Sequence, residues 1–313
     1  MAFALDIILF AVFAFILARS SIWAVKSVRK ISSFLKLGEF VTGFLILAIA
    51  TSLPELFVSI NAAMMKNSEL ALGNVIGSNI ADIAFVLAIV ILLSRGIKVK
   101  SRTVRNDSFY MLLLAALPII LLINGSLSRI DGVILLVAFA FYVYKMLKQR
   151  RKFEKKVNQV TGTEMFNSTA LFIVAIALVI ISANLLVKYG INISKDLSLP
   201  PIIIGLFLIA LGTSLPELVL GIRAIKAGYE GLSLGNIIGS VAVNSTLVLG
   251  VAAVISPITP HYSIFLSSGL LMLGICLLFM AFIQSGQKLS IKEGVILLMC
   301  YIFFIIIELG FKI

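Results

Sequence analysis

Apolar stretches that end at charged residues or at clusters of Gly, Pro and Asn follow one another along the whole chain. None of them alternates apolar and polar residues with a period of two, which excludes a transmembrane β-barrel. A helix that crosses a bilayer needs about 20 apolar residues. In lipid, a helix satisfies the hydrogen-bonding N–H and C=O groups of its own backbone. The pattern predicts ten membrane spans near residues 4–25, 37–65, 70–94, 107–124, 130–147, 167–188, 199–225, 231–256, 262–283 and 292–311.

The composition supports an all-α polytopic membrane protein. Of the 313 residues, 61% are hydrophobic and 13% are charged, whereas a soluble domain has about 45–50% apolar and about 25% charged residues. These proportions exclude a soluble enzyme, a nucleic-acid-binding protein and a disordered protein. Cys276, Cys300 and the single histidine, His261, show no metal-binding or disulfide spacing. We therefore expect no cofactor.

The net charge of +12 is explained by orientation in the membrane. Connections that follow the odd-numbered spans contain 21 of the 26 Lys and Arg residues, and the other side of the membrane has the remaining five. Because cytoplasmic connections hold the excess of positive charge, both termini are predicted to be extracellular, in a plasma membrane. The basic run at 145–156 could bind anionic lipid or a regulator, but we favour a role as a topological anchor.

An internal repeat relates the two halves of the chain. Residues 37–88 align with residues 199–250 at an offset of 162 without a gap, and 20 of the 52 positions are identical. The offset contains five spans, an odd number, so the second copy crosses the membrane in the opposite sense. Such inverted repeats are typical of secondary transporters. The expected organisation is a first five-helix repeat (1–150), a basic cytoplasmic connection (151–165) and a second five-helix repeat (166–313).

Three acidic residues lie deep within predicted spans: Glu55, Asp82 and Glu217. Asp6 and Glu308 lie closer to span ends and are expected at the membrane interface. A carboxylate inside the membrane costs free energy, so it is interpreted as functional by default. No Lys or Arg lies mid-span near these motifs, which argues against a purely structural ion pair. Glu55 and Glu217 are repeat equivalents, and each follows the sequence Thr-Ser-Leu-Pro. Because proline has no N–H and breaks helical hydrogen bonding, we expect free carbonyls around residues 48–51 and 210–213.

The second motif of each repeat adds more oxygen atoms. Ser78 and Asp82 are four residues apart and share one helix face, and their repeat equivalents are Ser240 and Asn244. Carboxylates, hydroxyls and carbonyls form an all-oxygen set that suits Ca²⁺, which takes 6–8 oxygen ligands. The Gly pairs in these motifs, at 73 and 77 and at 235 and 239, are expected to let helices approach closely.

With these motifs the chain resembles the sodium/calcium exchanger membrane family of the cation/calcium antiporter superfamily, in its prokaryotic form without regulatory domains. The evidence is the doubled TSLPE and GNxxGS motifs, with 23 residues from Glu to Ser in both copies. The resemblance implies Na⁺/Ca²⁺ antiport by alternating access, with spans 1 and 6 sliding against the others. The ion ligands that it implies are Ala48 and Ala210, through their carbonyls, and Thr51, Ser52, Glu55, Ser78, Asp82, Thr213, Ser214, Glu217, Ser240 and Asn244.

Two positions depart from the pattern of this family. The first copy has Ala50 where the second has Gly212, and the acid of the last polar pair is in the first repeat rather than the second.

Neighbouring carboxylates repel one another in a low dielectric, so occlusion should require bound cations. Three Na⁺ would balance three carboxylates. One Ca²⁺ would balance two, and Asp82 could then keep a proton.

Several alternatives remain open. A H⁺/Ca²⁺ exchanger or a K⁺-dependent Na⁺/Ca²⁺ exchanger could use the same carboxylates. Related proton-coupled families have an acid where this chain has Gly77–Ser78 and Gly239–Ser240, which favours Na⁺. An enzyme is not expected, because an intramembrane aspartyl protease needs two deep aspartates and only Asp82 qualifies. A channel would need an open path rather than two broken helices. The expected partners are the two ions and the lipid bilayer, with neither nucleic acid nor an obligate protein partner.

Overall fold

The computed structural model of the chain describes residues 2–34, 47–99, 102–149, 161–226, 228–286 and 288–310. Within these ranges, nine helical segments are long and apolar enough to cross a membrane. The predicted span 37–65 is described from Leu47 onward, and its earlier residues lie outside the described ranges. The chain is a nearly all-helical polytopic membrane protein, and its described helices are consistent with the predicted arrangement of ten spans in two inverted five-helix repeats.

The first repeat begins with one long helix and continues with helices that break or change pitch. Its elements are α1 (Ala2–Phe34), α2 (Leu47–Thr51), α3 (Leu53–Met64), α4 (Ser68–Ile80), the π-helix η2 (Ala81–Val86), α5 (Leu87–Ser94), β1 (Ile97–Lys98), α6 (Arg102–Leu121), the 3₁₀ turn η3 (Leu122–Asn124) and α7 (Arg129–Gln149).

The second repeat follows the same order. Its elements are α8 (Gly162–Asp196), α9 (Pro201–Ile204), the π-helix η5 (Gly205–Ile209), α10 (Ala210–Thr213), α11 (Leu215–Lys226), α12 (Glu230–Val243), the π-helix η6 (Asn244–Val248), α13 (Leu249–Ile255), α14 (Tyr262–Ser285), β2 (Lys288–Leu289) and α15 (Ile291–Gly310).

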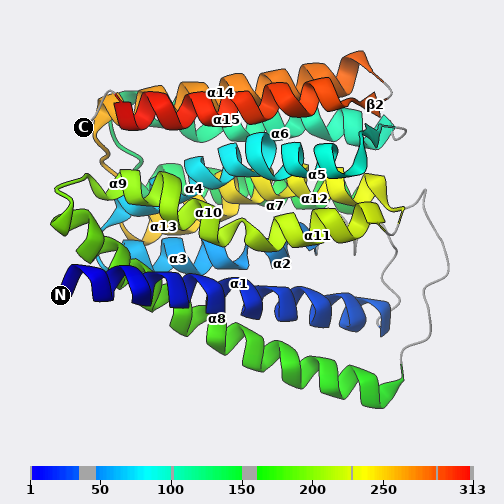
Figure 1. The fold of residues 1–313 in the computed structure, drawn as a ribbon, viewed down its shortest axis with the longest axis horizontal. Coiled ribbons are helices and arrows are strands. Elements are labelled where there is room, and N and C mark those ends of the chain that lie inside the picture. Colours follow the sequence, from blue (N-terminus) through cyan, green and yellow to red (C-terminus); the bar gives the residue numbers. More distant parts are fainter. Residues whose placement is uncertain are drawn as a thin grey trace.

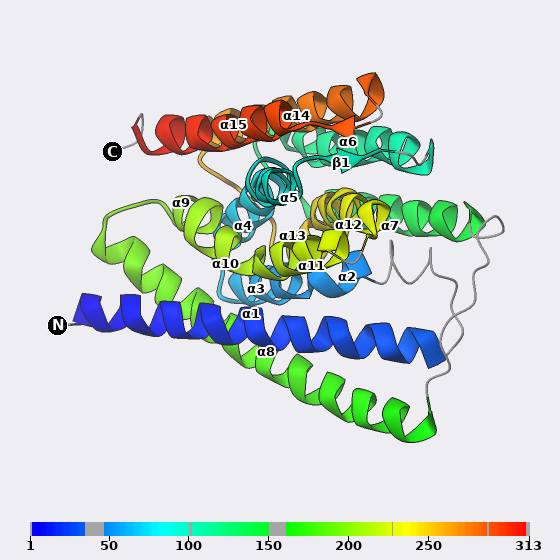
Figure 2. The same cartoon turned by 45° about the vertical axis from the view of Figure 1, so that its right-hand side comes forward.

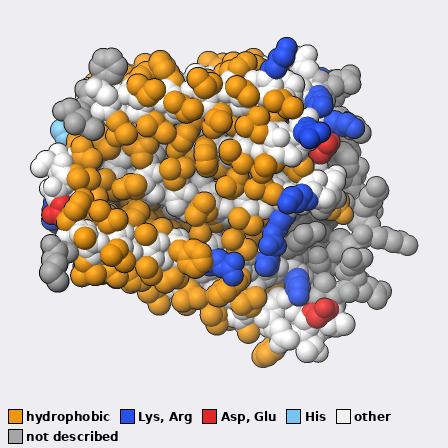
Figure 3. All heavy atoms as spheres, in the orientation of Figure 1, with side chains coloured by type: hydrophobic (Ala, Val, Ile, Leu, Met, Phe, Trp, Pro, Cys, Tyr) orange, Lys and Arg blue, Asp and Glu red, His pale blue; other side chains and the backbone are white. Residues whose placement is uncertain are grey.

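The helices form three groups across the molecule. Helices α1 and α8 lie side by side along one edge, and α6, α14 and α15 lie along the opposite edge (Figures 1 and 2). The interrupted helices of both repeats, including α4, α10, α11 and α12, lie between these groups. Both termini lie at one end of the molecule (Figure 1), and the Lys and Arg side chains visible in Figure 3 gather near the other end.

Helices α1 and α8 are longer than the predicted spans 4–25 and 167–188, with 33 and 35 residues respectively. Charged residues such as Lys26 and Lys30 end an apolar run, but they do not end a helix because Lys and Arg are good helix formers. Helix α8 starts with a capping box, in which the Thr161 hydroxyl accepts the Glu164 N–H and the Glu164 carboxylate accepts the Thr161 N–H. The last residues of the predicted connection 151–165 are therefore helical.

Two short β pairings join the repeats at opposite ends of α6. Strand β1 pairs with β2, with Ile97 opposite Leu289, and an isolated bridge joins Leu127 to Ile258. Leu289 is the repeat equivalent of Leu127, at the offset of 162. These pairings add two strands to the helix-only expectation, and their approximate symmetry agrees with inverted repeats.

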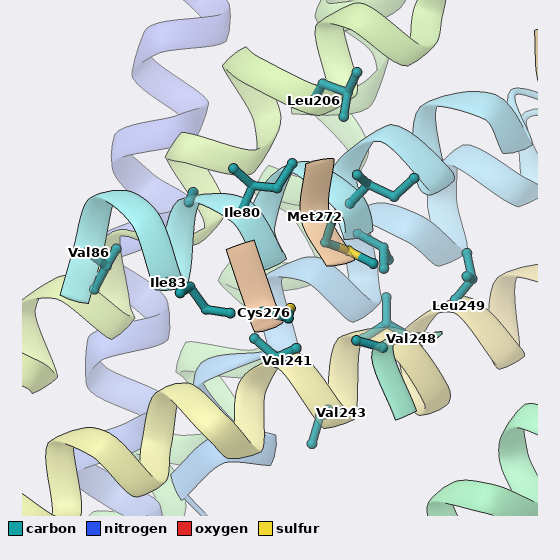
Figure 4. Packing of buried hydrophobic residues seen from close by; sticks show 14 of the residues in the cluster. Ile80, Ile83, Val86, Leu206, Val241, Val243, Val248, Leu249, Met272 and Cys276 are labelled. Carbon is teal, nitrogen blue, oxygen red and sulfur yellow. The ribbon is translucent and has the colours of Figure 1, made fainter. Parts of the chain in front are cut away.

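Apolar side chains fill the centre between the repeats. Ile80, Ile83, Leu206, Val241 and Met272 are all at most 1% exposed, and they pack around α4, η2 and α12 (Figure 4). The face of the molecule seen in Figure 3 is mostly apolar as well. An apolar interior that is enclosed by an apolar exterior is the arrangement expected of a protein embedded in lipid.

The glycines of the first GNxxGS motif allow close helix packing, which confirms that expectation for this repeat. A Cβ atom on Gly73 would overlap the backbone of Ile202, and one on Gly77 would overlap the backbone of Leu206 and approach Ala210 Cβ to 2.7 Å. Helix α4 therefore lies directly against α9, η5 and α10. This contact brings Ser78 and Asp82 to the broken helix of the other repeat.

We expect Gly77→Ala to destabilise the protein by about 1–3 kcal/mol, the usual cost of overpacking. The matched control is Gly274→Ala on α14, because no atom lies within 4 Å of the added Cβ there. Alanine at an open helical position is neutral or stabilising by up to about 1 kcal/mol. Thermal unfolding of both variants in detergent tests this. Equal midpoints for the two variants would contradict close packing at Gly77.

Candidate cation site

Each repeat contains a helix that is interrupted immediately before its glutamate. In the first repeat, α2 ends at Thr51 and α3 begins at Leu53. Ser52, between them, has φ −81° and ψ 5°, in the sparsely populated bridge region of the backbone map. Pro54 has no N–H to donate to the carbonyl of Ala50 one turn earlier. The interruption starts a new helix whose first turn contains Glu55.

The second repeat has the same interruption. Ser214 lies between α10 and α11 with φ −79° and ψ 0°, and Pro216 leaves the Gly212 carbonyl without a helical donor. Glu217 lies in the first turn of α11. The sequence predicted both breaks from proline, and the structure confirms them.

The expectation of a free carbonyl is wrong for Ala48 and for its equivalent, Ala210. The Ala48 carbonyl accepts the Ser52 N–H at 3.0 Å and the Thr51 hydroxyl at 3.2 Å. The Ala210 carbonyl is bonded in the same way by Ser214 and Thr213. Helical hydrogen bonds run from residue i to i−4, so each proline removes the donor of the carbonyl two residues further along, at 50 and 212.

The second motif of each repeat continues into a π-helical turn. Asp82 lies in η2, directly after α4, and Asn244 is the first residue of η6, directly after α12. π-Helical turns within α-helices are rare and occur frequently at functional sites. Their presence at the two equivalent polar positions was not predicted from the sequence.

The two repeats meet through reciprocal hydrogen bonds. Thr51 of the first repeat donates to Asn236 Oδ1 at 3.2 Å and lies 3.3 Å from the Ser240 hydroxyl. Correspondingly, Thr213 of the second repeat donates to Asn74 Oδ1 at 3.3 Å and lies 3.2 Å from the Ser78 hydroxyl. Each interrupted helix is therefore connected to the GNxxGS helix of the other repeat, about a local pseudo-twofold axis.

The two glutamates have equivalent surroundings. The hydroxyls of Ser78 and Thr213 lie beside the Glu55 carboxylate. Around Glu217 the equivalent residues take these places, with the Thr51 hydroxyl beside its carboxylate and the Ser240 hydroxyl donating to Oε1 at 3.4 Å. Each glutamate therefore faces one threonine from the other repeat and one serine from its own.

Asp82 completes a group of three interacting carboxylates. The Ser214 hydroxyl lies beside Asp82. Glu55 repels both Asp82 and Glu217, and Asp82 also repels Glu217. Among the described residues, no three Asp, Glu, His or Cys side chains converge on one metal position. A cation bound here would therefore need hydroxyl and carbonyl ligands in addition to the carboxylates.

The predicted polar site residues are all buried, and many lack a partner. None is more than 2% exposed: Thr51, Ser52, Glu55, Ser78, Asp82, Thr213, Ser214, Glu217, Ser240 and Asn244. Within the described ranges, no hydrogen-bond partner exists for either carboxylate oxygen of Glu55 and Asp82, for Glu217 Oε2, for the Ser52 and Ser214 hydroxyls or for the Asn244 amide. Unpaired charge is expensive to bury, so this group of oxygens needs cations or protons.

Sequence reasoning missed two residues at this site, Asn74 and Asn236. Both are buried and contact the threonines across the repeat interface. The signal was available, because the asparagine of GNxxGS is identical in both copies.

Glu308 also differs from expectation. Its position near a span end suggested an interfacial acid, but it is buried and accepts a hydrogen bond from Ser267 at 2.8 Å.

Comparison with known proteins identifies the family of the chain. The family described as "Sodium/calcium exchanger protein" matches residues 5–148 and 167–310. The chain is 30% identical to sodium/calcium exchanger MaX1 of Methanosarcina acetivorans, over 93% of this chain and 95% of that protein. It is 31% identical to inner membrane protein YrbG of Escherichia coli, over 69% of this chain and 70% of that protein.

A solved structure has the same fold. It is the sodium-calcium exchanger NCX_Mj soaked with 2.5 mM Na⁺ and 10 mM Sr²⁺, which superposes with a TM-score of 0.71 at 28% identity. The match covers 97% of this chain and 98% of that chain. From the family match over both repeats and the similarity to these exchangers, we conclude that the chain belongs to the sodium/calcium exchanger family.

Proposed function

We propose that this protein is a secondary active antiporter that exchanges Na⁺ for Ca²⁺ by alternating access. The observation that carries the proposal is the group of three buried carboxylates, of whose six oxygens five lack a hydrogen-bond partner in the described part of the chain. Burying such charges without compensation is prohibitive. Bound cations remove this cost, and hard cations prefer the oxygen ligands gathered here. Membership of the exchanger family supports Na⁺ and Ca²⁺ as the ions.

In this proposal the two glutamates bind both kinds of ion, and the serines contribute ligands to two flanking Na⁺ sites. Ser52 and Ser78 bind one flanking Na⁺, and Ser214 and Ser240 bind the other. The remaining ligands are Thr51, Thr213, Asp82, Asn244 and the carbonyls of Ala48 and Ala210. The equivalent surroundings of Glu55 and Glu217 support this symmetric assignment.

Charge balance makes exchange obligatory. Three Na⁺ neutralise Glu55, Glu217 and Asp82, whereas one Ca²⁺ neutralises two of them and Asp82 keeps a proton. An empty site would leave repelling charges in a low-dielectric interior, so only loaded states convert between the two sides. Because the Asp82 proton then crosses with Ca²⁺ and leaves before Na⁺ binds, the cycle exchanges three Na⁺ for one Ca²⁺ and one H⁺ and moves no net charge.

We propose that α1 and α8 slide together against the remaining helices. Their arrangement supports this, because they lie side by side at one edge of the molecule, against the interrupted helices (Figures 1 and 2). One side-chain hydrogen bond between the pair and α3, from Asn184 to Asn61 Oδ1 at 3.0 Å, is present in the described ranges. A mainly apolar contact can slide without breaking many polar interactions.

The proposed topology has both termini outside a plasma membrane and the connection 151–165 in the cytoplasm, between repeats at 1–150 and 166–313. The location of the termini at the end opposite the visible Lys and Arg side chains supports it (Figures 1 and 3), because positive charge accumulates on the cytoplasmic side.

Flux measurements in proteoliposomes test the proposed function. We expect ⁴⁵Ca²⁺ uptake when Na⁺-loaded vesicles are diluted into Na⁺-free buffer, and no uptake when a pH gradient alone is applied. Omitting K⁺ should not change the rate. Uptake driven by the pH gradient and indifferent to Na⁺ would contradict Na⁺ coupling and favour a proton exchanger. Uptake that requires K⁺ would favour the K⁺-dependent form.

A further inference from the structure

The reciprocal bonds between threonine and asparagine raise a question of proton placement. Each threonine hydroxyl has one proton and two lone pairs. Apart from the Ser78 hydroxyl at 3.2 Å and the Glu55 carboxylate beside it, Thr213 Oγ1 has two amide acceptors within reach, Asn74 Oδ1 at 3.3 Å and the Ala210 carbonyl at 3.2 Å. Thr51 Oγ1 has the equivalent pair, Asn236 Oδ1 at 3.2 Å and the Ala48 carbonyl at 3.2 Å. The proton can satisfy only one acceptor well at a time.

The choice of acceptor decides which oxygens remain for a cation. If the threonine donates to the alanine carbonyl, its proton occupies a lone pair on an oxygen of the same helix. If it donates to asparagine, the proton points toward the other repeat. Both hydroxyl lone pairs then stay available, together with the one carbonyl lone pair that the backbone N–H of Ser52 or Ser214 does not use. Cations bind through lone pairs, so only the second arrangement gives the full set of oxygen ligands.

The neighbouring contacts hold Asn74 in the orientation that this role needs. Asn74 Nδ2 donates to the Ser59 hydroxyl at 3.0 Å and to the Glu55 carbonyl at 3.2 Å. These bonds fix the amide so that Oδ1 faces Thr213. The same amide therefore connects the glutamate helix of its own repeat to the threonine of the other.

The second repeat lacks both of these anchors. The equivalent of Ser59 is Gly221, which has no hydroxyl, and Asn236 Nδ2 is buried without a partner in the described part of the chain. Its orientation depends on Thr51. The two halves of the site are therefore not equivalent, although the motifs are identical.

We propose that Asn74 and Asn236 are positioning residues that accept the hydroxyl protons of Thr213 and Thr51, and so turn threonine lone pairs and the Ala210 and Ala48 carbonyls toward the transported cation. This inference rests on the proposed function, because the cation is the one exchanged. It assigns a role to the asparagine of GNxxGS that is distinct from ion ligation. Each asparagine acts through one named hydroxyl.

A double-mutant cycle tests the proposal by equilibrium ⁴⁵Ca²⁺ binding and Na⁺-driven uptake in proteoliposomes. Asn74→Ala and Thr213→Val should each raise the Kd for Ca²⁺ about tenfold, or about 1.4 kcal/mol. Once the hydroxyl is absent, the asparagine has no proton to accept, so the double variant should also be about tenfold weaker. A merely structural asparagine would give independent effects that multiply to about a hundredfold, and that result would overturn the proposal.

Asn79→Ala is the matched control. Asn79 is buried on the same helix and donates to Ser245 at 2.9 Å, and it makes no hydrogen bond to Thr51 or Thr213 within the described ranges. Its effect on Ca²⁺ binding, whatever its size, should multiply with that of Thr213→Val. Coupling between Asn79 and Thr213 as strong as that between Asn74 and Thr213 would contradict the proposed specificity.

The second repeat provides an independent cycle with Asn236→Ala and Thr51→Val. Asn236 Nδ2 has no partner to lose, so this variant should fold even where loss of the Asn74 anchors unfolds the protein. Multiplying effects here would also overturn the proposal. Wild-type protein without Na⁺-driven uptake would refute the proposed function itself, whereas an active wild type with multiplying effects would refute only the role of the asparagines.

Discussion

Glu55→Gln and Glu217→Gln should each lower Na⁺-driven Ca²⁺ uptake by about a hundredfold or more. Glutamine keeps the shape of the side chain and one oxygen, but it removes the charge that neutralises the cation. Leaving one buried charge without its counter-charge costs about 3–5 kcal/mol, which corresponds to a hundredfold or more. Both residues are completely buried, so solvent cannot replace the missing charge.

The measurement is ⁴⁵Ca²⁺ uptake into Na⁺-loaded proteoliposomes that contain equal amounts of each variant. Glu69→Gln is the matched control, because Glu69 is partly exposed in the first turn of α4, away from the helix breaks. It should transport at nearly the wild-type rate. Because Glu55 and Glu217 have equivalent surroundings, a large difference between their variants would contradict the symmetric assignment of ligands.

Asp82→Asn should lower Na⁺-driven uptake at least about tenfold. The double variant Asp82→Asn with Asn244→Asp, called the exchanged pair, should recover most of the lost uptake. The single change leaves two carboxylates for three Na⁺, so the loaded site has a net charge in a low dielectric. The exchanged pair restores the number of carboxylates at the repeat-equivalent position, which lies in the corresponding π-helical turn.

Uptake rates of the single variants and the exchanged pair, measured over a range of Na⁺ concentrations, test this prediction. Asn244→Asp alone is the control for adding a carboxylate. If the number of carboxylates is decisive, the uptake rate of the exchanged pair exceeds that of Asp82→Asn. An exchanged pair that is slower than the single variant would mean that the side of the pseudo-twofold axis, rather than the charge, determines Na⁺ binding.

Much of the site was predictable because the repeat supplies two copies of the same evidence. Identical TSLPE segments in spans of opposite direction indicated two helices broken at Pro54 and Pro216, and the structure interrupts them two residues earlier, at Ser52 and Ser214. The glycines at 73 and 77 indicated close helix packing, which the structure confirms. Proline and glycine act through backbone sterics, and these effects depend little on distant residues.

Other features depend on contacts between distant residues, and local pattern could not predict them. Hydropathy describes how deep a residue lies in the membrane but not whether a helix or lipid lies beside it. For this reason Glu308, near the end of its span, was expected at the interface although it is buried. The bonds of Asn74 and Asn236 to threonines more than a hundred residues away are of the same kind.

Helix length and pitch were also beyond the pattern. The apolar part of α8 ends where charged residues begin, but the helix extends to 35 residues. Lys, Arg and Glu have high helix propensity, so a helix can continue into water. The π-helical turns at Asp82 and Asn244 have no established signal in composition or periodicity, since one extra residue in a turn reflects how the neighbouring helices pack.

Competition between the two ions at one site is the most direct test of this mechanism. Equilibrium binding of ⁴⁵Ca²⁺ to the purified wild-type protein should be measured while NaCl is added, with KCl at the same ionic strength as the control. If the carboxylates serve both ions, Na⁺ displaces Ca²⁺ with a Hill slope above one, and K⁺ leaves Ca²⁺ bound. Equal effects of NaCl and KCl, or Ca²⁺ binding that Na⁺ does not change, would contradict a shared site.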